Sequence, residues 1–366
     1  MRPDSNDVAA RRRTAAEVQI NRVLAVLARI ERKSPALPVG LPTVMEVSGR
    51  QAVNPAIPPP ELPIPDEGAG RGDREVTGTE PSTTAAGLVR LAKFSTPTQT
   101  RATAFYWRLD HPVVVRVTIA RPGRQPRRRA ALTARARIGL PHLMRAPELL
   151  DHGRTLQAAY VVEQLVFGAH PRSVPDKQQL GEEVIDTLFE TFGQIDLRAA
   201  SEKTHPATQE RLGRLLRLVP FVEGWPTESD LLSAVARLVD AKRPLPTGWT
   251  HGDVVFSNLI RDPHGVVYLI DWENAGVRPV VADLAKVAAA MPGTSGLERV
   301  LARGPGSALE AAQGGMMLAE QLTRYYLQEL SWWEPKYRRA QQTDRMPTFE
   351  AWVRRRMELT AILLAA

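Results

Sequence analysis

The pattern of apolar residues changes once along the chain, near Gly168, and this change limits the possible fold more than any other feature. Residues 88–165 contain short runs of β-branched and aromatic residues, which favour strands. After Gly168, apolar residues recur at three- and four-residue steps, the spacing of one helix face. We therefore predict an α+β chain in which a small, mainly antiparallel sheet lobe precedes a mostly helical lobe.

The part before Gly168 carries strand-like segments and one helix-like segment. Asp110-His111-Pro112 separates two runs of β-forming residues, which predicts a hairpin. We expect strands at 103–109, 113–119, 148–150 and 158–165, with His152-Gly153 between the last two, and a helix at 128–138.

The part after Gly168 has a helical pattern with a single interruption. Helix-spaced apolar residues occur at 180–192, 205–219, 228–240, 282–290, 309–330 and 348–364. The interruption, Thr250–Trp272, is rich in strand-forming residues and contains the polar residues that say most about function.

The first 86 residues differ from both parts. The apolar residues between Ala9 and Lys33 predict an amphipathic helix, which needs a surface to pack on. Pro35–Pro81 contains three consecutive prolines and a Gly-rich stretch, which predict an extended or disordered linker. We therefore divide the chain into an N-terminal extension (1–86), a sheet lobe (87–166) and a helical lobe (167–366).

The composition is that of a globular protein. Zero Cys excludes disulfides, thiolate metal sites and cysteine nucleophiles. No apolar run approaches the length of a membrane span, so we expect a soluble, cytoplasmic protein without membrane contacts. The formal charge of +8 could indicate a nucleic-acid partner. We do not expect one, because the densest basic run, Arg121–Arg129, lacks interleaved aromatic residues that stack on bases.

Within the interruption, an Asp-Pro-His-Gly sequence lies between two apolar runs and predicts a tight turn. Leu259–Arg261 should then pair with Val266–Ile270. Folding about this turn places Asn258 near Leu269 and leaves Asp271 one diagonal step away, about 7–8 Å at the backbone. An amide oxygen and a carboxylate can then share one ion, and oxygen ligands suit Mg²⁺.

Asp253 precedes Asn258 by five residues, and Gly252 just before it permits an unusual backbone conformation. Phosphoryl transfer needs a group that orients a hydroxyl and accepts its proton, together with groups that clamp metal-bound phosphates. A base Asp followed five residues later by a metal-binding Asn serves both needs. The spacing therefore favours phosphoryl transfer.

These residues resemble the aminoglycoside phosphotransferase and choline kinase family, which consists of small-molecule kinases related in fold to protein kinases. His251–Asn258 (HGDVVFSN) is similar to the catalytic loop of that family. Leu269–Gly276 (LIDWENAG) is similar to its metal-binding segment, and Val281–Ala285 to the acidic step that follows.

The resemblance implies a two-lobed protein-kinase-like fold over about residues 88–366, with 87–166 as the nucleotide-binding lobe and with ATP and Mg²⁺ as cofactors. It further implies that Asp253 is the catalytic base, that Asn258 and Asp271 are Mg²⁺ ligands, and that His251 braces the loop.

Several of these side chains also have purely structural interpretations. His251 is expected to hold the loop by hydrogen bonds rather than to transfer protons, because Asp253 already fills the position of the base. Asp283 fits two roles equally, a helix N-cap or a partner bonded back to the catalytic loop. Trp272 is expected to pack, and Asp262 to form the turn.

The nucleotide-binding lobe departs from the kinase pattern. Arg116 stands on the strand where kinases place a phosphate-holding Lys; Arg keeps the charge and can still contact phosphate oxygens. The Glu expected on the following helix is missing, and Arg129 occupies about its place. The end of the lobe follows the family, which implies that the backbone of Glu163 and Leu165 meets adenine.

We expect ATP-dependent phosphorylation of a hydroxyl on a small molecule, either an aminoglycoside-like compound or another antibiotic or metabolite. The acidic residues between Glu182 and Asp196 would suit a polycationic acceptor, but their spacing is also that of any solvated helix. Two alternatives stay open. The chain could be a Ser/Thr kinase for a peptide or protein bound through the N-terminal extension, or a pseudokinase scaffold without transfer activity, which Arg116 and the missing helical Glu motivate.

Overall fold

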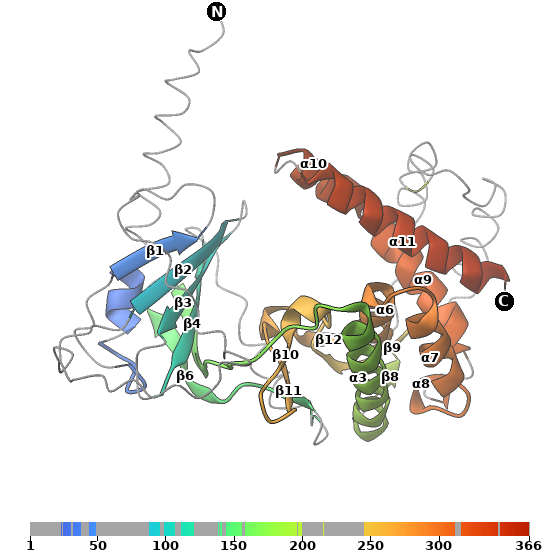
Figure 1. Cartoon of the computed structure of the whole chain (residues 1–366), viewed down its shortest axis with the longest axis horizontal. Coiled ribbons are helices and arrows are strands. Elements are labelled where there is room, and N and C mark those ends of the chain that lie inside the picture. Colours follow the sequence, from blue (N-terminus) through green and yellow to red (C-terminus); the bar gives the residue numbers. More distant parts are fainter. Residues whose placement is uncertain are drawn as a thin grey trace, which may run out of the picture. The chain divides into compact units, whose positions relative to one another are not determined.

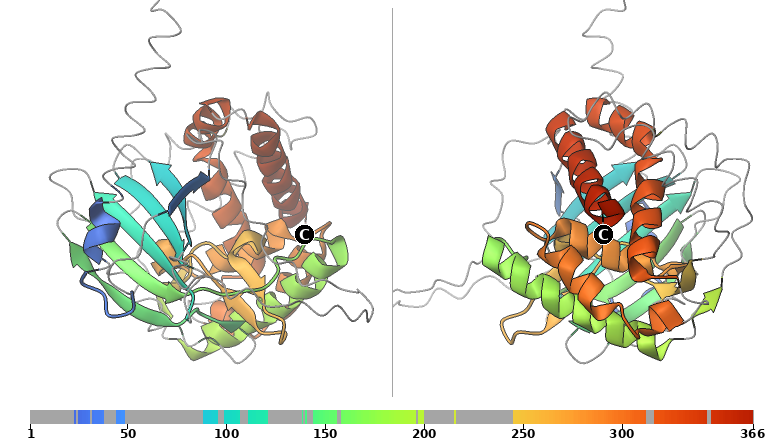
Figure 2. Two further views of the ribbon diagram at one scale, coloured as in Figure 1. Left: turned by 60° about the vertical axis from the view of Figure 1, so that its left-hand side comes forward. Right: turned by 90° about the vertical axis from the view of Figure 1, so that its right-hand side faces the viewer.

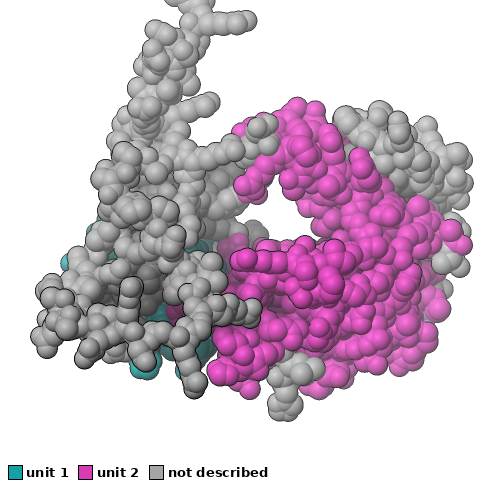
Figure 3. Space-filling model, viewed as in Figure 1, with its two compact units in different colours: residues 1–126, 147–165 teal, residues 127–146, 166–366 magenta. Residues whose placement is uncertain are grey.

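A computed structural model of the chain forms two compact units, which Figure 3 shows in different colours. Unit 1 comprises Met1–Pro126 and Pro147–Leu165, and unit 2 comprises Arg127–Ala146 and Val166–Ala366. The structure describes residues 23, 25–30, 32–37, 44–48, 88–95, 99–106, 111–120, 138, 140, 144–155, 158–195, 197–199, 215, 245–311, 316–342 and 345–365.

Unit 1 is built on a six-stranded sheet (Figures 1 and 2). In spatial order its strands are β1 (Val44–Ser48), β2 (Leu88–Ser95), β3 (Gln99–Tyr106), β4 (Val113–Ala120), β7 (Ala158–Gln164) and β6 (Leu149–Thr155). β1 and β2 are parallel, and all other neighbours are antiparallel. The hairpin predicted around Asp110 is confirmed, because β3 and β4 pair along their full length.

The core of unit 1 follows from the strand pattern. The apolar residues at alternate positions of β4 are all buried, namely Val113, Val115, Val117 and Ile119. Burying each such side chain stabilises the fold by about 1.5–3 kcal/mol. Arg116 lies on the same strand, β4, between the buried residues Val115 and Val117.

Part of the predicted N-terminal helix packs against this core. Residues 25–30 are helical, and the apolar side chains of this turn share one buried cluster with Tyr106 of β3 and Val115 of β4. The surface that the amphipathic pattern required is therefore the sheet of unit 1. Five residues of the segment predicted as a linker form β1, and much of the remainder of 1–86 lies outside the described residues.

One prediction for unit 1 is wrong. His152-Gly153 does not separate two strands, because both residues lie inside β6, where Gly153 is opposite Tyr160 of β7. A Cβ at position 153 would lie 2.7 Å from the Tyr160 hydroxyl, so a glycine at this position leaves the space that the Tyr160 ring occupies. The helix predicted at 128–138 lies outside the described residues, except for Ile138.

Unit 2 is mostly helical. Its described helices are α3 (Val174–Gln194), α6 (Val281–Ala290), α7 (Ser295–Arg303), α8 (Ala308–Ala311), α9 (Leu318–Leu330), α10 (Trp333–Gln342) and α11 (Met346–Ala365). The helices predicted at 180–192, 282–290 and 348–364 are confirmed, whereas the one at 309–330 is divided into α8 and α9. The helices predicted at 205–219 and 228–240 lie outside the described residues, except for Leu215. Among the described helices, none is long and apolar enough to cross a membrane.

Helix ends and helix packing in unit 2 follow from identifiable residues. Ser173 caps α3 and exchanges hydrogen bonds with Asp176, a capping box that fixes where the helix begins. The Tyr326 hydroxyl on α9 donates to the carbonyl oxygen of Ala285 on α6 at 2.9 Å, so these two helices are tied together in the core. α9 also packs against α11 (Figures 1 and 2).

Two small sheets position the interruption at 250–272. One has the order β10 (Leu259–Arg261), β11 (Val267–Leu269) and β5 (Met144–Arg145); the other has the order β12 (Gly276–Pro279), β9 (Pro246–Thr250) and β8 (Arg198–Ala199). Thr250 lies opposite Gly276, so the start of the interruption and the segment that follows it are held side by side. The predicted α+β class, a small and mainly antiparallel sheet part with a mostly helical part, is confirmed.

Candidate active site

The loop between β9 and β10 carries three of the predicted site residues. His251 and Asp253 follow β9 directly, and a short 3-10 helix, Phe256–Asn258, leads into β10. Gly252 has φ = 77°, and a Cβ there would lie 2.7 Å from the carbonyl oxygen of Asn274. Only glycine meets both conditions, and the turn that it makes sends Asp253 out of the strand direction.

The hairpin predicted after this loop is confirmed, with its register shifted by one residue. Leu259, not Asn258, lies opposite Leu269. The Ile270 N–H donates to the carbonyl oxygen of Asn258 at 2.9 Å. Asn258 therefore faces Ile270, and Asp271 is the next residue along the chain. The side chain of Asp262 closes the turn by accepting two backbone N–H groups, as predicted.

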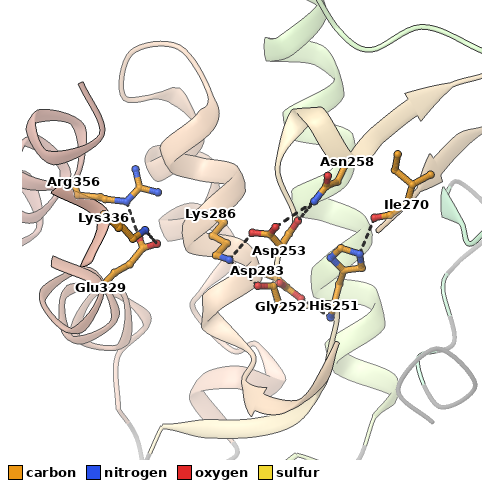
Figure 4. A network of polar contacts seen from close by, with 10 residues as sticks. All are labelled: His251, Gly252, Asp253, Asn258, Ile270, Asp283, Lys286, Glu329, Lys336 and Arg356. Carbon is orange, nitrogen blue, oxygen red and sulfur yellow. Dashed lines mark hydrogen bonds and ion pairs between the residues drawn. The ribbon is translucent and has the colours of Figure 1, made fainter. Parts of the chain in front are cut away.

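Asp253 and Asn258 are in direct contact. The Asn258 Nδ2 donates to the backbone oxygen of Asp253 at 2.9 Å and lies 3.4 Å from its Oδ2 (Figure 4). Because the nitrogen of this amide is turned towards Asp253, its oxygen is turned away and can serve as a metal ligand.

Asp271 has φ = 66° and ψ = 53°, the left-handed conformation. Among the described residues it is the only residue other than glycine with a positive φ. Such a conformation costs free energy and concentrates at functional sites, where it directs a side chain. A carboxylate here and the amide oxygen of Asn258 are hard oxygen ligands, the kind that Mg²⁺ takes together with water and phosphate oxygens. The two residues fit the ion that the resemblance implies.

Lys286 completes the surroundings of Asp253, although the sequence did not single it out. Its Nζ lies 2.6 Å from the Asp253 Oδ1 and donates to the carbonyl oxygen of Gly252 at 2.7 Å (Figure 4). Lys286 is on α6, three residues after Asp283, and this spacing places both side chains on one side of the helix. That spacing was the signal that could have identified it.

Asp283 is bonded back to the loop and does not cap α6. Its Oδ2 accepts the backbone N–H of His251 at 3.0 Å, and the helix already begins at Val281. Burial raises the pKa of Asp283 to about 6, although the nearby Lys286 and hydrogen bonds act in the opposite direction. Of the two roles predicted for Asp283, the structure has the second.

His251 makes the contacts of a bracing residue. Its Nε2 donates to the carbonyl oxygen of Ile270 at 3.0 Å, which fixes the tautomer, and its ring meets Trp272 edge-on at 4.9 Å. Burial lowers the pKa of His251 to about 4, so the ring is neutral at pH 7. Trp272 packs as predicted, with its indole N–H donating to the carbonyl oxygen of Leu269 at 2.7 Å.

In unit 1, Arg116 and Glu163 form an ion pair. The Arg116 Nε donates to the Glu163 Oε2 at 2.9 Å. Val114 lies opposite Glu163 in the β4–β7 ladder, so the paired side chains are diagonal neighbours. A strand carboxylate is thus a partner of Arg116, in place of the helical Glu that the sequence lacks. The Leu165 N–H donates to the carbonyl oxygen of Pro112 at 2.9 Å, so any contact of its backbone with adenine falls to its carbonyl group.

Two acidic residues of α3 are engaged by arginines of unit 2. The Glu183 carboxylate accepts from Arg261 of β10 at 2.7 Å. Asp186 accepts from Arg299 and lies 3.4 Å from Arg303, both on α7. These pairs tie α3 to its neighbours, and this use of the carboxylates weakens the prediction that α3 attracts a polycationic acceptor.

A model of the phosphotransferase enzyme family matches residues 100–341, about two thirds of the chain. The match includes the hairpin of unit 1 and the complete segment from His251 to Lys286. The chain belongs to this phosphotransferase family. It is therefore a phosphotransferase, and the predicted family is confirmed.

Solved structures with a similar fold include three kinases. A choline/ethanolamine kinase family protein from Mesorhizobium loti is 17% identical over 75% of this chain and 88% of its own, with a TM-score of 0.43. The choline kinase LicA from Streptococcus pneumoniae is 18% identical over 72% and 89%, with a TM-score of 0.44. The spectinomycin phosphotransferase APH(9)-Ia, solved with ADP and spectinomycin, is 11% identical over 75% and 92%, with a TM-score of 0.44. No curated protein matches the chain.

Proposed function

We propose that this phosphotransferase moves the γ-phosphoryl group of ATP to a hydroxyl of a small molecule, with Asp253 as the base and with Asn258 and Asp271 as the residues that hold Mg²⁺. The observation that carries this proposal is the arrangement around the Asp253 carboxylate. Asn258 is beside one of its oxygens, Lys286 is on the other, and its side chain is still 31% exposed. A base must be fixed in direction and yet reachable by the acceptor, and this carboxylate meets both conditions.

The proposed reaction is a direct displacement. The acceptor oxygen forms a bond to the γ-phosphorus while the bond to the bridging oxygen breaks, so that ADP leaves with the electron pair. Asp253 orients the acceptor hydroxyl and takes its proton. When bound, Mg²⁺ neutralises charge on the phosphate oxygens.

The remaining residues of the site act on the loop in this proposal. His251 joins the loop to the segment that carries Asp271, through its bond to Ile270. Asp283 holds the backbone at His251, and Lys286 fixes the Asp253 carboxylate. Arg116 contacts phosphate oxygens of the nucleotide, and the backbone of Glu163 with the carbonyl of Leu165 meets adenine.

The test is the Asp253→Asn variant, which keeps the shape of the side chain and removes the base. Turnover should fall by about 10²–10⁴-fold, the usual contribution of a general base, while Mg-ATP still binds in calorimetry. The readout is ADP release over a panel of hydroxyl acceptors, with the phosphorylated product identified by mass spectrometry. Asp262→Asn, in the turn nearby, is the matched control and should keep wild-type turnover. Wild-type turnover in Asp253→Asn would remove Asp253 from the mechanism, and a wild-type protein that binds no Mg-ATP at millimolar concentration would favour the scaffold.

A further inference from the structure

A cluster of charged side chains on the C-terminal helices faces the loop of Asp253, and the reaction described above does not use it. Glu329 of α9 accepts a hydrogen bond from the Arg356 Nε of α11 at 2.7 Å and lies 3.7 Å from the Lys336 Nζ of α10. The ring of Trp352 packs against both cations, with Lys336 4.0 Å and Arg356 4.9 Å from its centroid. We call these four residues the α9–α11 cluster.

The α9–α11 cluster lies near the proposed base. Figure 4 shows Glu329, Lys336 and Arg356 on the side of Lys286 that faces away from Asn258. The pKa of Lys336 is lowered, first by burial, and the charges of Lys286 and Asp253 both reach it. In the space-filling view, unit 2 is hollowed beneath the C-terminal helices (Figure 3). An acceptor that presents its hydroxyl to Asp253 would meet this cluster with its other end.

The charges of the cluster do not balance. Within the part of the chain that the structure describes, Lys336 and Arg356 share the carboxylate of Glu329, and the nearby carboxylate of Asp253 already has Lys286. The side chains of Arg356 and Glu329 are only 12% and 13% exposed, so water screens them weakly. Lys336, the second cation on this carboxylate, is 44% exposed, so an anion from solvent can reach it. Such an anion would supply the partner that Glu329, already bonded to Arg356, provides only in part.

The geometry of Arg356 also suits an anion. Its Nε is the nitrogen that bonds Glu329, and among the described residues no hydrogen bond engages its two Nη groups. Paired N–H groups of a guanidinium match the two oxygens of a carboxylate or phosphate. The aromatic face of Trp352, which could otherwise attract an ammonium group, already carries two cations of the chain itself.

We propose that the α9–α11 cluster binds a carboxylate or phosphate group of the acceptor, so that the substrate is an anionic hydroxyl compound and not a polycation. This inference rests on the proposed function, because it assigns the other end of the same acceptor site. Arg356 and Lys336 are its specificity-determining residues, and Glu329 orients both.

The experiment compares acceptors that share one carbon skeleton and differ in charge. Glucose, gluconate, glucose 6-phosphate and glucosamine form one set; glycerol, glycerate, glycerol 3-phosphate and 3-amino-1,2-propanediol form a second. The full chain is assayed for ADP release, and binding of each compound is measured by calorimetry without nucleotide. In at least one set, kcat/KM for an anionic member should exceed that for the cationic member about 10–100-fold, the worth of a hydrogen bond to a charged group. The carboxylate and phosphate members show which anion the cluster prefers.

The variants separate specificity from folding. Arg356→Met and Lys336→Met should raise KM for the anionic acceptor about tenfold or more, while KM for ATP stays unchanged. Arg356→Lys keeps the charge and should recover part of the loss. Arg338→Met is the matched control, because Arg338 is also on α10 but is 72% exposed, and it should behave as wild type.

Each outcome decides one of the two proposals. Preference for the cationic members, or an anion preference that Arg356→Met leaves intact, overturns the acceptor class while the phosphotransfer proposal stands. Calorimetric binding of the anionic members that Arg356→Met abolishes, with no turnover of any member, supports the cluster and counts against the proposed phosphorylation of such acceptors. If no anionic member binds and none is phosphorylated, the cluster is not an anion site.

Discussion

Two close cation–carboxylate pairs, Arg116–Glu163 in unit 1 and Lys286–Asp253 in unit 2, differ in what surrounds them. In unit 1, Arg116 and Glu163 are diagonal neighbours on adjacent strands, and their side chains are 19% and 5% exposed. In unit 2, Lys286 and Asp253 come from a helix and a loop, and the Asp253 side chain is 31% exposed. Glu163 is therefore sealed by the sheet, whereas Asp253 is held in place and remains accessible.

The difference shows that a short ion-pair distance does not by itself tell whether the pair stabilises the fold or prepares a functional carboxylate. Both pairs are within 3 Å, yet a buried pair mainly protects the fold against an unpaired charge, and an accessible one can prepare a carboxylate for a ligand. Removing the cation from each pair by the same substitution, to methionine, separates these two roles.

Arg116→Met should produce the larger effect on stability, which is measured without nucleotide so that any contact of Arg116 with phosphate plays no part. The substitution leaves the Glu163 carboxylate buried without this partner, which costs about 3–5 kcal/mol of the free energy of unfolding. Urea denaturation followed by circular dichroism measures this change without nucleotide. The double variant Arg116→Met/Glu163→Met removes both charges and should recover much of the loss. If the single variant is as stable as wild type, the pair is not structural and the contrast between the units disappears.

Lys286→Met should act mainly on rate. Without Lys286 the Asp253 carboxylate keeps its contact with Asn258 but loses the partner that fixes its other oxygen, and we expect kcat to fall about 10–100-fold with little change in KM. The free energy of unfolding should fall by only about 1 kcal/mol, because part of the pair is exposed to water. Steady-state kinetics and urea denaturation on the same sample provide both values. Lys286→Arg keeps a cation and should restore part of kcat, which a purely structural role would not predict.

The site in unit 2 was more accessible to sequence analysis than the pair in unit 1, for a physical reason. The spacing of Asp253, Asn258 and Asp271 is encoded locally, since one turn and one hairpin bring these residues near each other. The turn has its own signal in Asp262, and this is why the pairing was predicted to within one residue. Lys286 was missed because its contact with Asp253 depends on how a separate helix packs against the loop.

Unit 1 shows the opposite situation. The hairpin of β3 and β4 follows from β-forming residues and a Pro-containing turn, but the partner of Arg116 lies on β7, more than forty residues away in sequence. A search for a helical Glu could not find Glu163, because the diagonal contact exists only once the order and register of the strands are known. The same holds for His152-Gly153, which the sequence predicts to lie between two strands, because its place inside β6 depends on the pairing of Gly153 with Tyr160.

The buried groups behind Asp253 should make stability depend on pH, with opposite effects that leave only a small net change in the wild type. His251 has a folded-state pKa of about 4, below its unfolded value, so its contribution is complete above about pH 6.5 and is lost as the pH falls. Asp283 has a folded-state pKa of about 6, above its unfolded value, so its contribution is complete below about pH 4 and is lost as the pH rises through 6. Between about pH 4 and pH 6.5, the contributions of His251 and Asp283 to the free energy of unfolding therefore change with pH in opposite directions.

Between pH 7 and pH 5 the free energy of unfolding of the wild type should therefore change little on account of this pair. Asp283→Asn leaves only the His251 contribution. The free energy of unfolding of that variant should therefore fall by about 2 kcal/mol between pH 7 and pH 5, whereas that of the wild type changes little. His251→Gln leaves only the Asp283 contribution and should gain about 1 kcal/mol over the same interval. Urea denaturation of the three proteins at both pH values measures these differences, and each variant is the other's control. Parallel pH dependences in all three proteins would mean that neither group is buried as it is in this structure. Other residues would then have to provide the rigid support behind the Asp253 loop, which distinguishes unit 2 from the sealed pair of unit 1.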